Sequence, residues 1–201
     1  MNYKTTMKKS IIAKREDGFV ISYATFEDFK NLKNLVKNLS KESKCLFTAW
    51  LFDEKPTIKV RIGQIIAPLS LLPFIGPLTK KIFPMAYLVI LQVKSPQSTV
   101  VGFVYLNKFQ KISDGYFSAT QGTVISDDYQ SKGLGTFLRN YMQEVAKKEN
   151  LGIMKACTVV ENKKSLSFYE KNGFEVEKIE KNVLLSCGKR HDTVEFVKKY
   201  F

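Results

Sequence analysis

The sequence contains few of the side chains that bind metals or form disulfide networks. Its 201 residues include three cysteines, Cys45, Cys157 and Cys187, and a single histidine, His191. The cysteines are odd in number and none of these residues stands at a metal-ligand spacing, so a zinc site is disfavoured and free thiols are expected. The first residues also lack the apolar core of a signal peptide. Free thiols and the missing signal peptide together predict a cytoplasmic protein without a metal cofactor.

The sequence also lacks a continuous apolar helix long enough to cross a membrane. Its most hydrophobic segment, about residues 62–86, is interrupted at Pro68, Pro73 and Pro77, whereas a membrane span needs about 20 predominantly apolar residues in one helix. Two interpretations stay open. The segment is either a loop or hairpin that covers the core, or an apolar lid or patch that contacts a substrate, a membrane surface or a partner.

Acidic residues are scarce relative to basic ones. There are 19 Asp and Glu against 32 Lys and Arg, which gives a formal net charge of +13. Such a chain attracts polyanions, and charge alone does not choose among nucleic acid, an anionic membrane and a phosphorylated small ligand. Nucleic acid is disfavoured as a partner, because no recognition-helix signature or aromatic-rich binding motif accompanies the lysines.

The hydrophobic pattern predicts one domain at residues 13–201, preceded by a flexible basic tail at residues 1–12. A strand at 115–125, a helix at 133–148 and a strand at 153–160 follow the order of a parallel crossover. Thr25 is expected to cap the first helix, and Asn172-Gly173 to end the last one. The other expected elements are strands at 19–23, 87–93, 100–106, 176–185 and 193–200, and helices at about 26–39, 40–52 and 163–171.

A glycine-containing turn lies between the strand and the helix of this crossover, in the order Gln130-Ser131-Lys132-Gly133-Leu134-Gly135. A helix start leaves its first N–H groups unpaired and has a positive partial charge, so glycines there allow a phosphate to approach the backbone. Lys132 adds a full positive charge. The same pattern also occurs in plain connectors, so the motif alone leaves both interpretations open.

A second motif, from Asn162 to Phe174, makes the first more specific. It reads Asn-Lys-Lys-Ser-Leu-Ser-Phe-Tyr-Glu-Lys-Asn-Gly-Phe. Together, residues 122–176 resemble the core of the GNAT superfamily, the acetyl-coenzyme A dependent N-acetyltransferases. The stretch from Thr123 to Gly135 is similar to the family's strand and Q/R-x-x-G-x-G/A loop, and the second motif to its Asn, Phe-Tyr and Gly-Phe signature. Asp127 stands where the family often has Pro, and Gln130 where it often has Arg.

The resemblance implies an α+β (mixed α/β) fold with a central mixed, mostly antiparallel sheet flanked by helices, and acetyl-coenzyme A as acyl donor. It implies that the loop N–H groups hold the pyrophosphate, that the strand before the loop pairs with the pantetheine arm, and that Tyr169 is the general acid for the leaving thiolate. The implied cofactor-binding residues are Thr123, Val124, Ile125, Gln130, Ser131, Lys132, Gly133, Leu134, Gly135, Asn162 and Ser165.

The general base is not assigned, because the strand at 116–125 contains no Asp or Glu. Glu161 and Asp114 are candidates by position only. The leading hypothesis is an N-acetyltransferase that transfers acetyl to a primary amine by direct attack in a ternary complex. The alternative is a GNAT-like module that binds acyl-coenzyme A or a partner without transfer. The acceptor stays open, with the segment at 62–86 favouring a hydrophobic or macromolecular one, and a homodimer also stays open.

Overall fold

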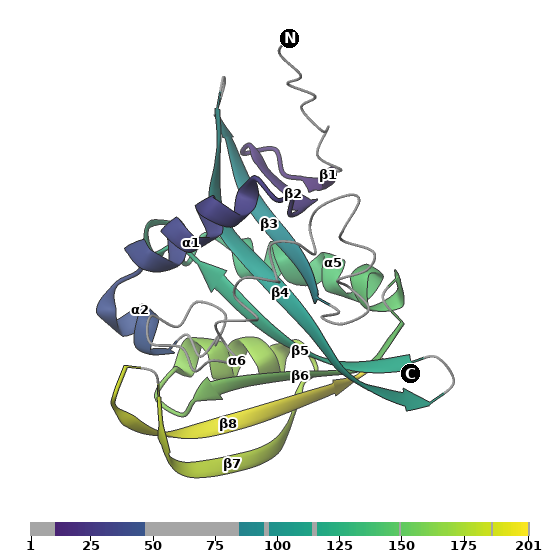
Figure 1. The fold of residues 1–201 in the computed structure, drawn as a ribbon, viewed down its shortest axis with the longest axis vertical. Coiled ribbons are helices and arrows are strands. Elements are labelled where there is room, and N and C mark those ends of the chain that lie inside the picture. The colour runs from purple at the N-terminus through teal and green to yellow at the C-terminus, as the bar shows by residue number, and fades with distance from the viewer. Residues whose placement is uncertain are drawn as a thin grey trace.

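The computed structural model describes residues 11–46, 85–94, 97–113, 116–148, 150–185 and 187–200, and these form a twisted sheet with helices on both faces (Figure 1). The strand order in the eight-stranded sheet of the described residues is β1-β2-β3-β4-β5-β6-β8-β7. The elements are β1 (Ile11–Lys14), β2 (Phe19–Tyr23), α1 (Asp28–Asn38), α2 (Lys41–Leu46), β3 (Met85–Lys94), β4 (Gln97–Ser113), β5 (Tyr116–Ile125), the 3-10 turn η2 (Asp127–Tyr129), α5 (Leu134–Lys148), β6 (Leu151–Val159), α6 (Lys163–Lys171), β7 (Glu175–Leu184) and β8 (Arg190–Lys199).

Neighbouring strands are antiparallel except for β5 and β6, which run parallel. Helix α5 makes the connection between these two strands, so the predicted crossover is confirmed. The predicted hairpin between β3 and β4 is confirmed as well, with Leu88 opposite Val104. The fold class expected from the sequence, a mostly antiparallel mixed sheet flanked by helices, is therefore the one observed.

Two hydrophobic clusters hold the helices on opposite faces of the sheet. On one face the apolar stripe of α1, centred on Leu32 and Leu35, packs against Phe103 and Tyr105 of β4. On the other face α5 and α6 pack around Phe196 of β8, which is fully buried. Side chains alternate between the two faces along a strand, so β4 and β5 contribute to both clusters and position the turn between them.

Most of the predicted elements occur within one to three residues of their expected bounds, with three corrections. Ile11 and Ile12 begin β1 and are not part of a flexible tail. Thr25 does not cap α1, which begins at Asp28 without a side-chain cap; instead, the Thr25 N–H and hydroxyl both donate to the Asp28 carboxylate, at 2.8 and 2.9 Å. Phe26 precedes the helix and is 46% exposed, so it does not belong to the apolar stripe.

The apolar segment expected to be a lid, a patch or a covering loop falls almost wholly outside the described residues. Only Met85 and Ala86 of it are described, and both are in β3. The second expected helix is α2, and the rest of its predicted range, 47–52, also lies outside the described residues. No helix within the described ranges combines the length and the hydropathy needed to cross a membrane.

The expectation of three free thiols is wrong for two of the cysteines. Cys45 on α2 and Cys187 in the β7–β8 turn form a disulfide, with their Cα atoms 5.1 Å apart. The buried Cys45 lies in a small apolar cluster with Val159 and Leu185, so the packing of α2 on the end of this hairpin brings the two sulfurs together. Their separation of 142 residues along the chain hides this proximity from sequence analysis. Cys157 is free.

The disulfide predicts a redox-dependent stability. Closing a loop this long stabilises a fold by up to about 5 kcal/mol in the chain-entropy account, so Cys187→Ser is expected to lower Tm by roughly 10 °C. Differential scanning calorimetry with and without reductant measures this, and Cys157→Ser is the matched control, in which the reductant should still lower Tm as it does in the wild type. A thiol titration of the denatured, unreduced protein should find only Cys157; three reactive thiols would contradict the bridge.

Candidate active site

A groove opens where β5 and β6 separate. Their pairing extends only from Phe117 opposite Leu151 to Thr120 opposite Lys155, and the halves of the two strands beyond this point do not pair with each other. The groove between them has a volume of about 850 Å³ and continues to the start of α5. Residues from the strands, from the loop after β5 and from α2 and α6 line it.

The predicted phosphate-binding loop lies at one end of this groove. Ser131 and Gly133 have φ angles of 62° and 72°, in the left-handed region that glycine adopts without strain. This turn lets the chain enter α5 at Leu134 directly behind the loop. All of the cofactor-binding residues predicted between Gln130 and Gly135 line the groove except Lys132, whose ammonium lies 4.7 Å from the centre of the Tyr129 ring. An anion at this end of the groove would therefore meet the backbone of the loop and not the Lys132 ammonium.

Asp127 connects the loop to α2. Its carboxylate accepts hydrogen bonds from the Ser40 N–H and the Ser43 hydroxyl, both at 2.6 Å, and from the Gln130 side-chain amide at 2.9 Å. Partial burial acts to raise the pKa of Asp127, but the hydrogen bonds from Ser43 and Ser40 outweigh it and hold the pKa below its usual value. These hydrogen bonds explain why an acidic residue is accommodated at a position where the GNAT superfamily, which the sequence resembles, often has proline.

Arg15, which the sequence analysis did not single out, supports the loop from the opposite side. One guanidinium nitrogen donates to the Lys132 carbonyl at 3.1 Å, and the same group lies 5.6 Å from the rings of Phe19 and Phe137. Asp17 completes its surroundings with an ion pair of 2.6 Å. Because Arg15 is 117 residues away from its carbonyl partner in the chain, no local pattern indicates this contact.

The second motif enters the groove at the start of α6. The Asn162 side-chain oxygen accepts from the Ser165 N–H at 3.1 Å, so Asn162 is the N-cap of this helix, as expected from the sequence. Both residues also line the groove, together with Thr123, Val124 and Ile125 of β5. The structure therefore brings the predicted strand and helix residues to one surface.

Tyr169 of α6 is packed in the core and also borders the groove. Its ring packs on Phe174 and Phe196, with centroids 5.2 and 5.1 Å apart, and is only 6% exposed, yet it also lines the groove. Burial raises its pKa far above the usual value, and the nearby Tyr105 and Cys157 raise it further. Its hydroxyl therefore stays protonated and available as a donor at physiological pH.

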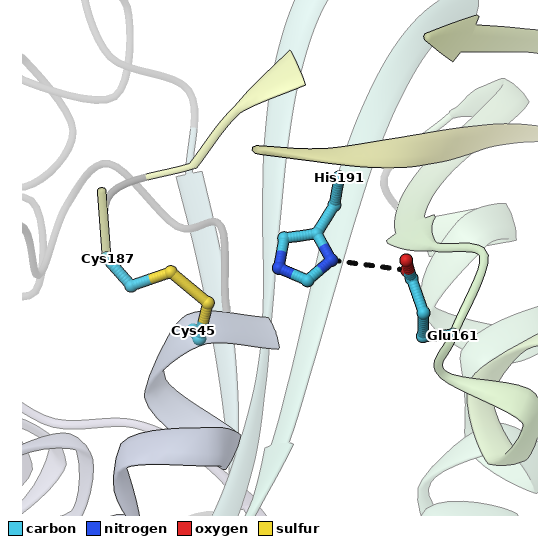
Figure 2. Close-up of a disulfide and its surroundings, with 4 residues drawn as sticks. All are labelled: Cys45, Glu161, Cys187 and His191. Carbon is cyan, nitrogen blue, oxygen red and sulfur yellow. Dashed lines mark ion pairs between the residues drawn. A yellow bond between two sulfur atoms is a disulfide. The ribbon is translucent and has the colours of Figure 1, made fainter. Parts of the chain in front are cut away.

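Of the two carboxylates considered as a base, Glu161 lines the groove, whereas Asp114 lies outside the described residues. The Glu161 side chain is 60% exposed, and its Oε2 lies 3.3 Å from Nδ1 of His191 on β8. Figure 2 shows this pair beside the Cys45–Cys187 disulfide. Within the described ranges, no group of three or more His, Cys, Asp and Glu side chains could hold a metal ion.

The hydrogen bonds of Asp127 predict a pH-dependent stabilisation. Asp127→Ala should lower the free energy of unfolding by about 1 kcal/mol near pH 7, because the Ser40 and Ser43 donors lose their acceptor. A carboxyl with a lowered pKa stabilises the fold above its unfolded pKa and loses this effect as pH falls through its folded value, so the difference should vanish at strongly acidic pH. Urea titration from pH 7 to pH 2.5 measures it, with the exposed Asp128→Ala as the control of equal charge; an equal effect of both variants would contradict the assignment.

Comparison with known proteins agrees with this geometry. Residues 80–174 match the Acetyltransferase (GNAT) family, while no curated protein matches the chain. Three solved structures are similar over nearly their whole length. The ribosomal-protein-S5-alanine acetyltransferase from Vibrio fischeri has a TM-score of 0.68 at 15% identity, covering 95% of this chain and 97% of its own. A ribosomal L7/L12 alpha-N-protein acetyltransferase in complex with coenzyme A has a TM-score of 0.67 at 17% identity, covering 94% and 98%.

The third is a mutant spermidine N-acetyltransferase from Vibrio cholerae, with a TM-score of 0.61 at 18% identity, covering 91% of this chain and 94% of that one. By their names, these neighbours acetylate ribosomal proteins or spermidine, so the shared fold serves acceptors of very different size. At such low identities the likeness establishes the fold and not the acceptor. The resemblance to the GNAT superfamily is thereby confirmed: the chain has the GNAT acetyltransferase fold, and its residues 80–174 match the family.

Proposed function

We propose that the protein is an N-acetyltransferase that transfers acetyl from acetyl-coenzyme A to a primary amine by direct attack in a ternary complex. The observation that supports this most is the course of the groove. It begins at the loop from Gln130 to Gly135, follows the separated half of β5 and contains Tyr169. A phosphate group, an extended arm and a reacting thioester fit these three parts in that order.

The loop and strand would hold the donor mainly through backbone groups. N–H groups at the start of α5 are suited to a pyrophosphate, since they combine unpaired donors with the positive end of the helix dipole. The pantetheine arm has amide groups, and the free edge of β5 at Thr123 to Ile125 offers matching N–H and C=O groups. Asn162 and Ser165 line the opposite wall near the same arm.

In the proposed reaction, the nitrogen lone pair of a neutral amine attacks the thioester carbonyl carbon. The C–N bond forms and an oxyanion develops, and backbone N–H groups of β5 at the groove would donate to it. The C–S bond then breaks and its electron pair leaves with the sulfur as a thiolate. The nitrogen loses its extra proton to water or to a carboxylate, and the solvent-exposed Glu161 is the groove carboxylate nearest to β6.

In this proposal, Tyr169 donates a hydrogen bond to the sulfur of the leaving coenzyme A. Because burial raises its pKa, the phenol stays neutral and donates a hydrogen bond to the thiolate as negative charge develops there. A thiol has an ordinary pKa of about 8.5, so complete proton transfer from this phenol to the sulfur is uphill in the resting protein. Hydrogen-bond donation in the transition state is therefore its main contribution, with the proton of the product thiol supplied as coenzyme A leaves.

Binding of acetyl-coenzyme A is the first prediction of this proposal. Calorimetric titration should give a saturable site in the wild type, and Gly133→Glu should abolish it by placing a carboxylate against the pyrophosphate. Gly133→Ala is the matched control, because both variants strain the backbone equally at φ 72° and only one adds charge. The alanine variant should retain measurable binding. A folded wild-type protein that binds no acetyl-coenzyme A would refute the proposal.

The second prediction concerns Tyr169. Tyr169→Phe preserves the contacts with Phe174 and Phe196, so it should bind acetyl-coenzyme A normally while kcat falls by roughly 100-fold. Thiol release with a reactive amine measures this. In the wild type the rate should rise with pH as the amine loses its proton and should not decline below pH 10, because the raised pKa keeps the phenol protonated. An unchanged kcat in Tyr169→Phe would remove Tyr169 from the mechanism, whereas a fall in the wild-type rate between pH 8 and 10 would contradict the raised pKa.

A further inference from the structure

A second tyrosine, Tyr105, lines the groove beside the unpaired half of β5. Tyr105 of β4 is directly opposite Gly122 of β5 in the antiparallel register, and its ring lies across that glycine. A Cβ atom placed on Gly122 would come closer than 3.0 Å to ring carbons of Tyr105 and would meet its hydroxyl. The Tyr105 ring occupies the space that a side chain at position 122 would need, so only glycine fits there. The ring also extends over β5 and lines the groove.

The position of this ring along β5 is informative. The last residue of β5 that pairs with β6 is Thr120, and Gly122 follows two residues later. Thr123, Val124 and Ile125 continue from Gly122 toward the phosphate-binding loop. A donor arm that starts at the loop and runs back along β5 passes these three residues first, over about 10 Å of strand, and its acyl end then arrives at Gly122.

The surroundings of the ring are uncharged and densely packed. Tyr105 is 9% exposed and lies close to Cys157 of β6. Burial, together with the nearby Cys157, raises the pKa of Tyr105 to about 12, so the hydroxyl is neutral at physiological pH. On its other side the ring belongs to the cluster beneath α1, where Phe103 is fully buried. The ring is therefore packed against the α1 cluster on one side and borders the groove on the other.

We infer that Tyr105 determines acyl-chain length: its ring closes the groove above Gly122, accepts an acetyl group and excludes longer acyl chains. This inference rests on the proposed function. A closed apolar end distinguishes chains by size, since each methylene that does not fit changes relative affinity by about 10- to 200-fold. The aromatic ring and its hydroxyl both lie over Gly122, but selection by size needs only the bulk of the ring, which Tyr105→Phe retains.

The test compares the dissociation constants of acetyl-coenzyme A and butyryl-coenzyme A by calorimetry, so it needs no acceptor and no turnover. The wild type should bind the butyryl compound at least 10-fold more weakly. Tyr105→Leu, which shortens the side chain, should reduce this ratio by at least 10-fold. Tyr105→Phe retains the ring and should keep the wild-type ratio.

The matched control is Phe103→Leu, which makes a similar change two residues earlier in β4, in the same cluster but outside the groove lining. It should lower Tm about as much as Tyr105→Leu while leaving the ratio unchanged. If the wild type binds both compounds equally, the inference is wrong and the proposed function stands. The same holds if Tyr105→Leu leaves the ratio of dissociation constants unchanged, or if Phe103→Leu reduces it. If the folded wild type binds neither compound, the proposed function fails first.

Discussion

The separation of β5 from β6 is the constraint on which the site depends. Buried backbone N–H and C=O groups need hydrogen-bond partners, and beyond Thr120 the facing edges of these two described strands do not supply them to each other. Their outer edges are already used, since β5 pairs with β4 and β6 with β8. Among the described residues, the inner edges beyond Thr120 line the groove, where a ligand with alternating donors and acceptors could pair with them. The amide groups of a pantetheine arm have this chemistry, so the separated strands suit the donor of the proposed function.

An open groove of this kind needs rigid ends, and long-range contacts supply them. At the loop end, Arg15 fixes the Lys132 carbonyl from one side, while Asp127 joins Ser40 and Ser43 of the α2 region to Gln130 from the other. The disulfide fixes the far end of α2 to the β7–β8 turn. Helix α2 is only six residues long and would be marginal by itself. Anchored at both ends, it forms a stable wall of the groove beside the phosphate-binding loop.

Features that depend on local pattern could be predicted from the sequence. The β5–α5–β6 crossover, the Asn162 cap and the turn at Gly133 each follow from periodicity or from the chemistry of one residue in its own segment. The contacts of Arg15, Asp127 and the two bridged cysteines could not be predicted, because their partners lie 84 to 142 residues away and no periodicity connects them. The role of Gly122 could not be predicted from the sequence either. Its role becomes visible only when the register places Tyr105 opposite it.

The interior of the groove also determines how protons can move. Tyr105, Cys157 and Tyr169 meet there, and burial raises the pKa of all three. None of them can accept a proton from an ammonium group, because each is already protonated at physiological pH. In the proposed reaction, the proton of an acceptor amine would therefore go to water or to a carboxylate that lines the groove, such as the exposed Glu161. The neutral hydroxyl and thiol donors of these three residues would stabilise negative charge that develops on oxygen and sulfur. Deprotonation of the acceptor amine would then depend on groups at the rim of the groove.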